Sequence, residues 1–431
     1  MTWRTANIAS MLVTLESGSR PKGGATVDSG EVPSLGGENI LSDGRVMLER
    51  VNRVPVAFYS RMSKGHLSDL DVLINKDGAQ TGKIGLYITR DHGPACINEH
   101  LFLLRGHPDQ VTQGYLYYTL LSEVVQRQIR AEITGSAQPG LKSGFVNNVS
   151  ALIPGDTREQ DMIAEVLATV DRAIDETAAV IAKQQRIKTG LMQDLLTCGI
   201  DEDGTLRTER THDFTDSPIG RVPVEWEVAP LSSFVPTAEY GISTSLGETG
   251  HPVLRMNNLS ESEAELSDLR FTDAPVPEHL WPRPGDVLFN RTNSWQHVGR
   301  TGIWRGQIEN ATFASYLVRL NPHPEKLLSE LLNLWLNWER TQIAMRRYAT
   351  PAVQQVNINP TNLRMVLAAF PTCLKEQQAI VDRFAATRVV LETYQVELKK
   401  LHALRRGLMA DLLSGDRRVT ALLGEREAVT A

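Results

Sequence analysis

Arginine, amide and aromatic side chains are concentrated in one short segment of the second half of the chain. Arg291, Asn293, Trp295, Gln296 and Arg300 lie within ten residues of one another. An arginine can donate two hydrogen bonds to the edge of a guanine, and a side-chain amide can pair with adenine. An indole ring can be inserted between neighbouring bases. The segment therefore has the residue types of a loop that recognises nucleic acid.

A related segment occurs in the first half of the chain. Lys76, Gln80 and Lys83 follow an asparagine there, just as Arg291 does in the second half. Each half also has a later amide-rich loop, which contributes Gln138 and Lys142 in the first half and Gln354, Gln355 and Asn357 in the second. Polar turns are usually only solvated, but similar loops at equivalent places favour binding. Their side chains differ, as expected if each half reads its own sequence.

Catalytic motifs are absent from the sequence. Residues 78–83 resemble a phosphate-binding loop, but only three residues separate the two glycines where four are needed, and Ile84 replaces the Ser or Thr that would hold magnesium. No nucleophile elbow, zinc-protease motif or dinucleotide fingerprint occurs. Asp382, Glu397 and Lys399 have a faint nuclease-like spacing, but alternating charge on a helix is typical of a solvated face. We expect no catalytic residue and no metal site in this chain.

Composition indicates a globular protein of two to three domains. The 431 residues include 45 Lys and Arg and 51 Asp and Glu, for a net charge of -6. Seven acidic and four basic residues in 159–196, and seven acidic and three basic in 197–225, account for this deficit. The remaining chain is close to neutral, so bulk acidity does not argue against nucleic-acid binding.

The cysteines and histidines indicate neither a disulfide framework nor a metal centre. The three cysteines are far apart and form no C-x-x-C pair, which favours a reducing, cytoplasmic setting. No signal peptide and no apolar stretch long enough to span a membrane is present. The ten histidines form no metal-spaced cluster, and His100 and His107 are interpreted as structural.

The chain contains an internal repeat, which appears when the sequence is shifted by 217 residues. Glu159-Gln160 then falls on Glu376-Gln377, and Gly-Leu-Met-x-Asp-Leu-Leu from 190 falls on the same letters from 407. Between 159 and 196, 11 of 38 positions are identical, where composition alone would give about two. The protein is therefore expected to consist of two copies of one unit, each a globular region followed by a long helix.

The two long helices are predicted from apolar residues that recur alternately every four and three positions. We expect this stripe to form the core of the helix pair, with the following members: Ile163, Leu167, Val170, Ile174, Ile181, Leu191, Leu195, Ile380, Phe384, Leu391, Tyr394, Leu398, Leu401, Leu408 and Leu412. A helix of 38 residues is about 57 Å long, too long for one small domain to cover. The helices most simply cover each other, as an antiparallel pair related by a pseudo-twofold axis.

The predicted fold class is α+β, with two mixed α/β domains joined by two long antiparallel coiled-coil helices. Strand-like runs such as Val72-Leu73-Ile74 and Leu101-Phe102-Leu103-Leu104 alternate with turns, and single helices are expected near 111–131 and 325–347. The predicted boundaries are a first domain at 1–155, a first long helix at 156–198, a solvated linker at 199–225, a second domain at 226–372, a second long helix at 373–415 and a tail at 416–431.

These motifs together resemble the specificity subunits of type I restriction-modification systems. The resemblance rests on the repeated Glu-Gln and Gly-Leu-Met-x-x-Leu-Leu motifs and on Phe214-Thr-Asp-Ser-Pro-Ile-Gly-Arg-Val-Pro-Val-Glu-Trp226, which is similar to that family's entry into a second target recognition domain. It covers nearly the whole chain. The openings of the two domains are also similar to the family and add Arg20, Lys22, Tyr240, Thr244 and Arg255 as candidate DNA-binding residues.

The resemblance implies a protein that is not an enzyme by itself. Each target recognition domain would read one half of a bipartite, asymmetric DNA site, and the helices would fix the spacer between the halves. Two adenine methyltransferase subunits carrying S-adenosylmethionine, and nuclease subunits that use ATP and Mg²⁺, would bind to it in a phage-defence complex. No cofactor would be bound by this chain.

Two other functions stay open on the sequence alone. The chain could be the recognition part of a stand-alone DNA methyltransferase or nuclease, although neither an S-adenosylmethionine loop nor a nuclease core is present in the sequence. It could also be a coiled-coil scaffold for other proteins with no role on DNA.

Overall fold

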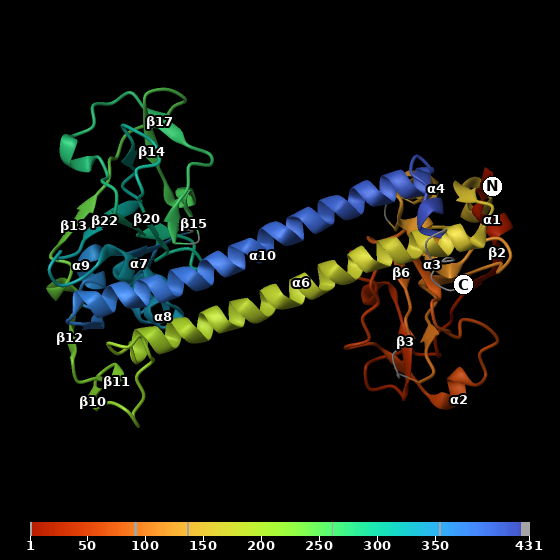
Figure 1. Ribbon diagram of the computed structural model, residues 1–431, viewed down its shortest axis with the longest axis horizontal. Coiled ribbons are helices and arrows are strands. Elements are labelled where there is room, and N and C mark those ends of the chain that lie inside the picture. The colour runs from red at the N-terminus through yellow and green to blue at the C-terminus, as the bar shows by residue number, and fades with distance from the viewer. Residues whose placement is uncertain (1, 90–92, 136–137, 261, 353–354, 424–431) are drawn as a thin grey trace. The chain divides into compact units, whose positions relative to one another are not determined.

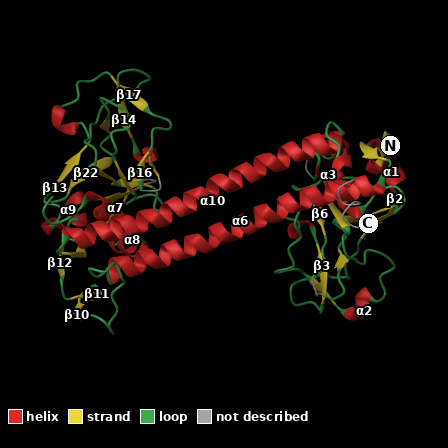
Figure 2. Cartoon of the chain, viewed as in Figure 1, coloured by secondary structure: helices red, strands yellow, loops and turns green. Residues whose placement is uncertain are grey.

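The computed structural model describes residues 2–89, 93–135, 138–260, 262–352 and 355–423. The chain forms two compact units, the first comprising Met1–Ala179 with Val396–Ala431 and the second Val180–Gln395. Two helices of 41 residues each, α6 (Thr157–Thr197) and α10 (Leu374–Ser414), begin in one unit and end in the other. All strands of the described residues lie in the globular parts, at the two ends of the long helices (Figure 2).

The first unit is built on a four-stranded antiparallel sheet in the order β2-β8-β5-β6. A smaller sheet has the order β4-β3-β7, and β1 pairs with β9 directly before α6. The elements of this unit are β1 (Trp3–Asn7), α1 (Ile8–Met11), β2 (Leu12–Ser17), β3 (Val32–Leu35), β4 (Arg53–Val54), α2 (Val56–Tyr59), β5 (Val72–Asn75), β6 (Ile84–Leu86), β7 (Cys96–Ile97), β8 (Leu101–Gly106), α3 (Gln113–Leu121), α4 (Glu123–Glu132), α5 (Phe145–Asn148) and β9 (Ser150–Pro154).

The second unit repeats the three sheets of the first among its described residues and adds further strands: β16 and β15 extend its central sheet, and β19-β24-β23 and β10-β11 form two more sheets. Its central sheet contains β13-β22-β18-β20 in the matching order, its smaller sheet is β17-β14-β21, and β12 pairs with β25 directly before α10 (Figure 1). Its elements are β10 (Phe214–Ser217), β11 (Gly220–Pro223), β12 (Trp226–Pro230), β13 (Thr237–Tyr240), β14 (His251–Leu254), β15 (Leu259–Ser260), β16 (Glu263–Ala264), β17 (Arg270–Thr272), β18 (Val287–Asn290), β19 (Thr292–Asn293), β20 (Thr301–Ile303), β21 (Thr312–Phe313), β22 (Leu317–Asn321), α7 (Ser329–Asn337), α8 (Glu339–Arg346), β23 (Ala349–Ala352), β24 (Gln355–Ile358), α9 (Pro360–Leu363) and β25 (Leu367–Pro371).

The two helices run antiparallel, and each unit shows this by its own contacts. In the first unit, the N-terminal half of α6 contacts the C-terminal half of α10, where Leu167 and Leu412 are buried in one core and Asp171 pairs with Arg405. In the second unit, the C-terminal half of α6 meets the N-terminal half of α10, with Lys188 Nζ 5.5 Å from the centroid of the Phe384 ring. The predicted fold class is confirmed.

The residues of the predicted helix core are buried or half-buried, with the exception of Tyr394. Its side chain is 37% exposed. A phenol keeps its hydroxyl in water at the edge of a seam more easily than an aliphatic side chain does, because burying an unpaired hydroxyl costs free energy.

The two helices predicted near 111–131 and 325–347 are each broken into a pair. The first breaks at Ser122, whose side-chain oxygen accepts a hydrogen bond from the backbone N of Val125 at 3.3 Å and so caps α4. The second breaks at the equivalent Trp338, between α7 and α8. No Pro or Gly lies at either break, so no helix-breaking residue reveals them in the sequence.

The segment 199–225, which was expected to be a solvated linker, is largely exposed but packs against the second unit at a few positions. Ile200 and Val222 are buried in the core of the second unit, and β10 and β11 form a hairpin. Arg207, of which only 9% of the side chain is exposed, forms a two-armed ion pair with Glu376, with 3.0 Å between Nη2 and Oε2. The acidic residues that suggested a solvated linker lie at the outward-facing positions of this segment.

The repeated Glu-Gln motif has a structural role that is the same in both units. Glu159 pairs with Arg418 from the segment after α10, as Glu376 pairs with Arg207 from the segment after α6. Gln160 accepts a hydrogen bond from Thr112 N and donates to the carbonyls of Gln110 and Pro154, and Gln377 makes the same three contacts with Leu328, Lys326 and Pro371. The motif holds each globular domain against the start of its own long helix.

Candidate nucleic-acid interface

The two segments whose side chains were predicted to read bases are the equivalent hairpin loops between β5 and β6 and between β18 and β20. In the first, Gly82 N donates to the carbonyl of Asn75 at 2.7 Å and Asn75 N donates to that of Lys83 at 2.8 Å. In the second, Gly299 N donates to Asn290 and Asn290 N to Arg300, both at 2.8 Å. Each loop therefore holds one cation just after the first strand and another just before the second.

The amide-rich loops lie directly against these hairpin loops. Leu141 N donates to the carbonyl of Lys76 at 2.7 Å, and Ile358 N donates to that of Arg291 at 2.8 Å. In the second unit the contact extends into a small sheet, in which β19 pairs with β24 and Thr292 is opposite Asn357. Two segments that are far apart in the sequence thus form one surface in each unit.

Arg291 is held at the centre of the surface in the second unit. Its guanidinium carbon lies 5.0 Å from the centroid of the Tyr240 ring, and its Nη1 donates to the carbonyl of Ser315 at 3.4 Å. Tyr316 accepts a hydrogen bond from Arg291 N at 3.0 Å through its carbonyl. Tyr240, Trp295 and Tyr316 are 45%, 52% and 44% exposed, so three aromatic rings are available at this surface.

Several polar atoms of this surface are buried without a hydrogen-bond partner among the described residues. They are Arg291 Nε, Thr292 Oγ1 and Asn357 Oδ1. Buried polar atoms in native proteins are nearly always paired, because an unpaired one costs about 1 to 3 kcal/mol. Three such atoms, on β19, on β24 and on the residue before β19, are consistent with a surface that receives its polar partners from a ligand.

The surface in the first unit has lysines and fewer aromatic rings. Lys76 Nζ donates to Ser17 Oγ at 3.0 Å and lies 5.2 Å from the centroid of the Phe102 ring. Lys83 Nζ donates to Gln80 Oε1 at 2.5 Å, and burial lowers the pKa of Lys83. His100, which the sequence assigned a structural role, is half-exposed beside this loop with Nδ1 3.3 Å from Asp77.

The remaining candidate residues are distributed differently. Asn293 and Gln355 lie on β19 and β24, and Gln138, Lys142, Gln296 and Arg300 are exposed in the same loops. Arg255 is turned toward Asp268, with Nη2 2.8 Å from Oδ2, and Thr244 Oγ1 lies 3.2 Å from Thr272 Oγ1. Arg20 pairs with Glu99 at 2.8 Å, and Lys22 is exposed. Gln354 lies outside the described residues.

The sequence did not single out Tyr316 or the asparagines that precede the two hairpin loops. Asn75 and Asn290 are buried, and the Oδ1 atom of each has no partner among the described residues. Tyr316 aligns with His100 in the internal repeat, so the sequence could have marked it as a candidate. That its ring is exposed follows only from the packing of β22. A role on nucleic acid for any of these residues stays a prediction.

Other kinds of site are not found in the described part of the chain. No three His, Cys, Asp or Glu side chains are grouped as they would be around a metal ion. Burial raises the pKa of the Cys96 thiol to about 11, and none of the three cysteines is in a disulfide. Within the same residues, no helix has the length and apolar character needed to cross a membrane.

No family profile matches the chain, but individual proteins do. It is 22% identical over 367 residues to the type I restriction enzyme MjaVIII specificity subunit of Methanocaldococcus jannaschii, covering 83% of this chain and 81% of that protein. It is 24% identical over 348 residues to the EcoKI specificity subunit of Escherichia coli, with shares of 74% and 72%. A putative MjaX specificity subunit of M. jannaschii is 24% identical over 214 residues, or 48% of this chain and half of that relative.

Solved structures share the fold. A type I restriction-modification S subunit from M. genitalium superposes with a TM-score of 0.58 at 14% identity, over 96% of both chains. A chain from a study of complex assembly and conformational transition in the type I restriction-modification system gives a TM-score of 0.60 at 16% identity, over 96% of this chain and 98% of that one. The sequence resemblance to type I specificity subunits is confirmed.

Proposed function

We propose that this chain, whose relatives are type I specificity subunits, is the DNA-reading subunit of a type I restriction-modification complex. One observation carries the proposal: the same composite surface, a cationic hairpin loop joined to an amide-rich loop, occurs in both units. Each surface reads one half of a bipartite, asymmetric site. Their side chains differ, with Lys76 and Lys83 in one and Arg291 and Arg300 in the other, so the two half-sites differ as well.

The proposed division of labour places the chemistry in other subunits. Two methyltransferase subunits bind to this chain, bring S-adenosylmethionine and methylate adenine, and nuclease subunits bring ATP and Mg²⁺. Adenine methylation requires the base to be flipped out of the duplex. This chain supplies the sequence reading and holds the subunits at the site, and its proposed substrate implies a cytoplasmic location.

The proposal is tested by co-expressing the chain with its methyltransferase partner and mapping methylated adenines across a genome. We expect one split sequence motif to be methylated, and no methylation by either protein alone. The block 226–371 is then exchanged for the corresponding block of another specificity subunit. One half of the motif should change and the other half should persist.

Other outcomes separate the alternative functions. Methyl transfer or cleavage by the purified chain alone would identify it as part of a stand-alone enzyme. Failure of the pair to methylate or bind any DNA would favour a protein scaffold. A block exchange that alters both halves of the motif would refute the assignment of one half-site to each unit.

A further inference from the structure

The residue before the second strand of each central sheet occupies an equivalent position in the two units. The register of β5 with β8 continues one residue further, because Lys76 N donates to the carbonyl of His100 at 2.9 Å. The register of β18 with β22 continues in the same way, with Arg291 N donating to the carbonyl of Tyr316 at 3.0 Å. Opposite side chains of an antiparallel pair share a face of the sheet. His100 and Tyr316 therefore each stand beside the first cation of a hairpin loop.

The edge strand of each sheet adds one more residue to this face. The residue two positions after His100 is paired with Ser17 of β2, and the residue two positions after Tyr316 is paired with Tyr240 of β13. Side chains two residues apart on a strand lie on the same face of the sheet. Ser17 and Tyr240 are therefore equivalent, and they share the face of His100 and Tyr316.

The first cation of each hairpin loop lies across this face toward the edge strand. Lys76 Nζ donates to Ser17 Oγ at 3.0 Å, and the guanidinium carbon of Arg291 lies 5.0 Å from the centroid of the Tyr240 ring. Three side chains thus form one group at the end of each central sheet, which we call the sheet-end group. Its members are Ser17, Lys76 and His100 in the first unit, and Tyr240, Arg291 and Tyr316 in the second.

The sheet-end group of the second unit is open to an external partner. Tyr240 and Tyr316 are 45% and 44% exposed. Among the described residues, the guanidinium of Arg291 donates only to the carbonyl of Ser315, and its buried Nε has no hydrogen-bond partner. Buried polar atoms in native proteins are nearly always paired, so the missing partner is expected from a ligand.

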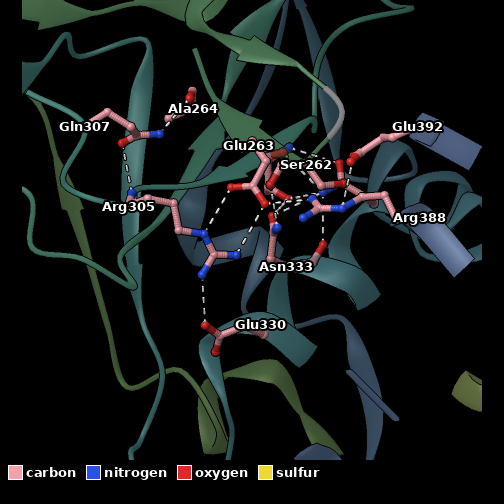
Figure 3. A network of polar contacts seen from close by, with 11 residues as sticks. Ser262, Glu263, Ala264, Arg305, Gln307, Glu330, Asn333, Arg388 and Glu392 are labelled. Atoms are coloured by element: carbon pink, nitrogen blue, oxygen red, sulfur yellow. Dashed lines mark hydrogen bonds and ion pairs between the residues drawn. The ribbon is translucent and has the colours of Figure 1, made fainter. Parts of the chain in front are cut away.

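Other arginines of the second unit are neutralised within the protein. Figure 3 shows Glu263 between the guanidinium groups of Arg305 and Arg388, 3.2 Å from Arg305 Nε and 2.8 Å from Arg388 Nη1. Arg305 Nη1 also lies 3.1 Å from a carboxylate oxygen of Glu330. This network has a structural role, since it joins the central sheet to α7 and α10. Arg291 differs from it in that its charge is left for a partner outside the unit.

The sheet-end group of the first unit has different chemistry at the same position. His100 is bracketed by two carboxylates, with Nδ1 3.3 Å from Asp77 Oδ2 and Nε2 3.4 Å from Glu99 Oε1. Glu99 Oε1 also lies 2.8 Å from Arg20 Nε. The other oxygen of Glu99 is buried and has no hydrogen-bond partner among the described residues. An imidazole beside carboxylates and an exposed phenol present different donors and acceptors to the edge of a base.

We propose that the residue before β8 and β22 is a specificity-determining position, at which His100 contacts a base edge in the first half-site and Tyr316 in the second. This inference rests on the proposed reading of DNA and deepens it, because it names one equivalent position at which the two units select different bases. The position is held by backbone hydrogen bonds alone, so its side chain can change while the sheet stays the same.

Exchange of the two side chains tests the position. His100→Tyr and Tyr316→His are each introduced into the full chain, which is then co-expressed with its methyltransferase partner. Binding is measured with duplexes that differ from the parent site by one base pair at a time. Each variant should change the ratio of affinities by about five-fold or more at one position of its own half-site, the lower end of what a base contact contributes. The other half-site should be read as before and is the internal control.

The matched control is His107→Tyr. His107 lies at the other end of β8, and its side chain is 46% exposed, against 47% for His100. This variant should change the preference in neither half-site, and all three variants should keep the Tm of the parent within about 2 °C.

The possible failures are distinguishable. If the parent complex reads a split site and both exchange variants keep its base preferences, the inference is overturned and the proposed function stands. A lowered Tm with weaker binding to all duplexes alike would show that His100 and Tyr316 only support the fold, which also overturns the inference. If the parent complex reads no split site, the proposed function is refuted, and the inference with it.

Discussion

Arg291 is the residue around which the proposed DNA-reading surface of the second unit is organised. Its guanidinium stacks on Tyr240, and its backbone joins the hairpin loop to β22 and to the end of β24. Its Nε has no partner among the described residues. A guanidinium held in this way is oriented before a ligand arrives, so less conformational entropy is lost when it binds.

Replacement of this side chain tests the role directly. Arg291→Ala should weaken binding to the cognate site by about 1 to 3 kcal/mol and relax the preference at one base pair, if the guanidinium makes two hydrogen bonds to guanine. The measurement is titration of the complex with cognate and altered duplexes at one salt concentration. The control is Arg340→Ala, since Arg340 also stacks on an aromatic ring, 5.7 Å from Trp338, but lies outside this surface. If the Arg291→Ala variant kept the same base preference, Arg291 would not read a base and would be only a surface cation.

At the scale of elements, the Glu-Gln motif determines where each domain sits on its helix. Gln377 is fully buried and ties the start of α10 to the segment before α7 and to the end of β25. Gln160 does the same for α6. In the sequence the motif resembled a family signature. The structure shows that its side chains hold each domain against its long helix.

Removal of one amide should therefore destabilise its unit. Gln377→Ala leaves the backbone N of Leu328 and two carbonyls without their partner, which should cost about 1 to 3 kcal/mol. Urea unfolding of the full chain measures the loss. The neighbouring Gln378→Ala is the matched control, because Gln378 is exposed and bonds only Asp382 on the next turn; it should cost less than about 0.5 kcal/mol. Equal losses from both variants would mean that the buried contacts contribute nothing special.

At the scale of the whole molecule, the charge distribution limits how strongly the isolated chain can hold DNA. The net charge is -6, and the excess acid lies in the first long helix and the segment after it. The two recognition surfaces carry local cations, chiefly Lys76, Lys83, Lys142, Arg291 and Arg300. Affinity from phosphate contacts grows with the number of cations that reach the backbone.

This limit can be measured as a salt dependence. About five phosphate contacts give a slope of log K against log salt no steeper than about -4.5. We expect the isolated chain to bind DNA weakly, with a shallow slope, and the complex with methyltransferase subunits to bind more tightly and with a steeper one. Fluorescence anisotropy between low and moderate salt gives both slopes. A steep slope for the chain alone would show a wider cationic surface than the two loops provide.

Local pattern was enough to determine the repeat, the two long helices and the loops that carry Lys76 and Arg291. Apolar periodicity depends only on residues that are close in the sequence, and the internal repeat appears when the sequence is aligned with itself. Both can therefore be recognised without a structure. Tertiary structure alone decided the strand order, the breaks at Ser122 and Trp338, and the packing of the supposed linker through Arg207. It also decided that the loops at 291 and 355 form one surface. These features depend on contacts between segments far apart in the chain, and the spacing of residues along a sequence does not specify which distant side chains meet.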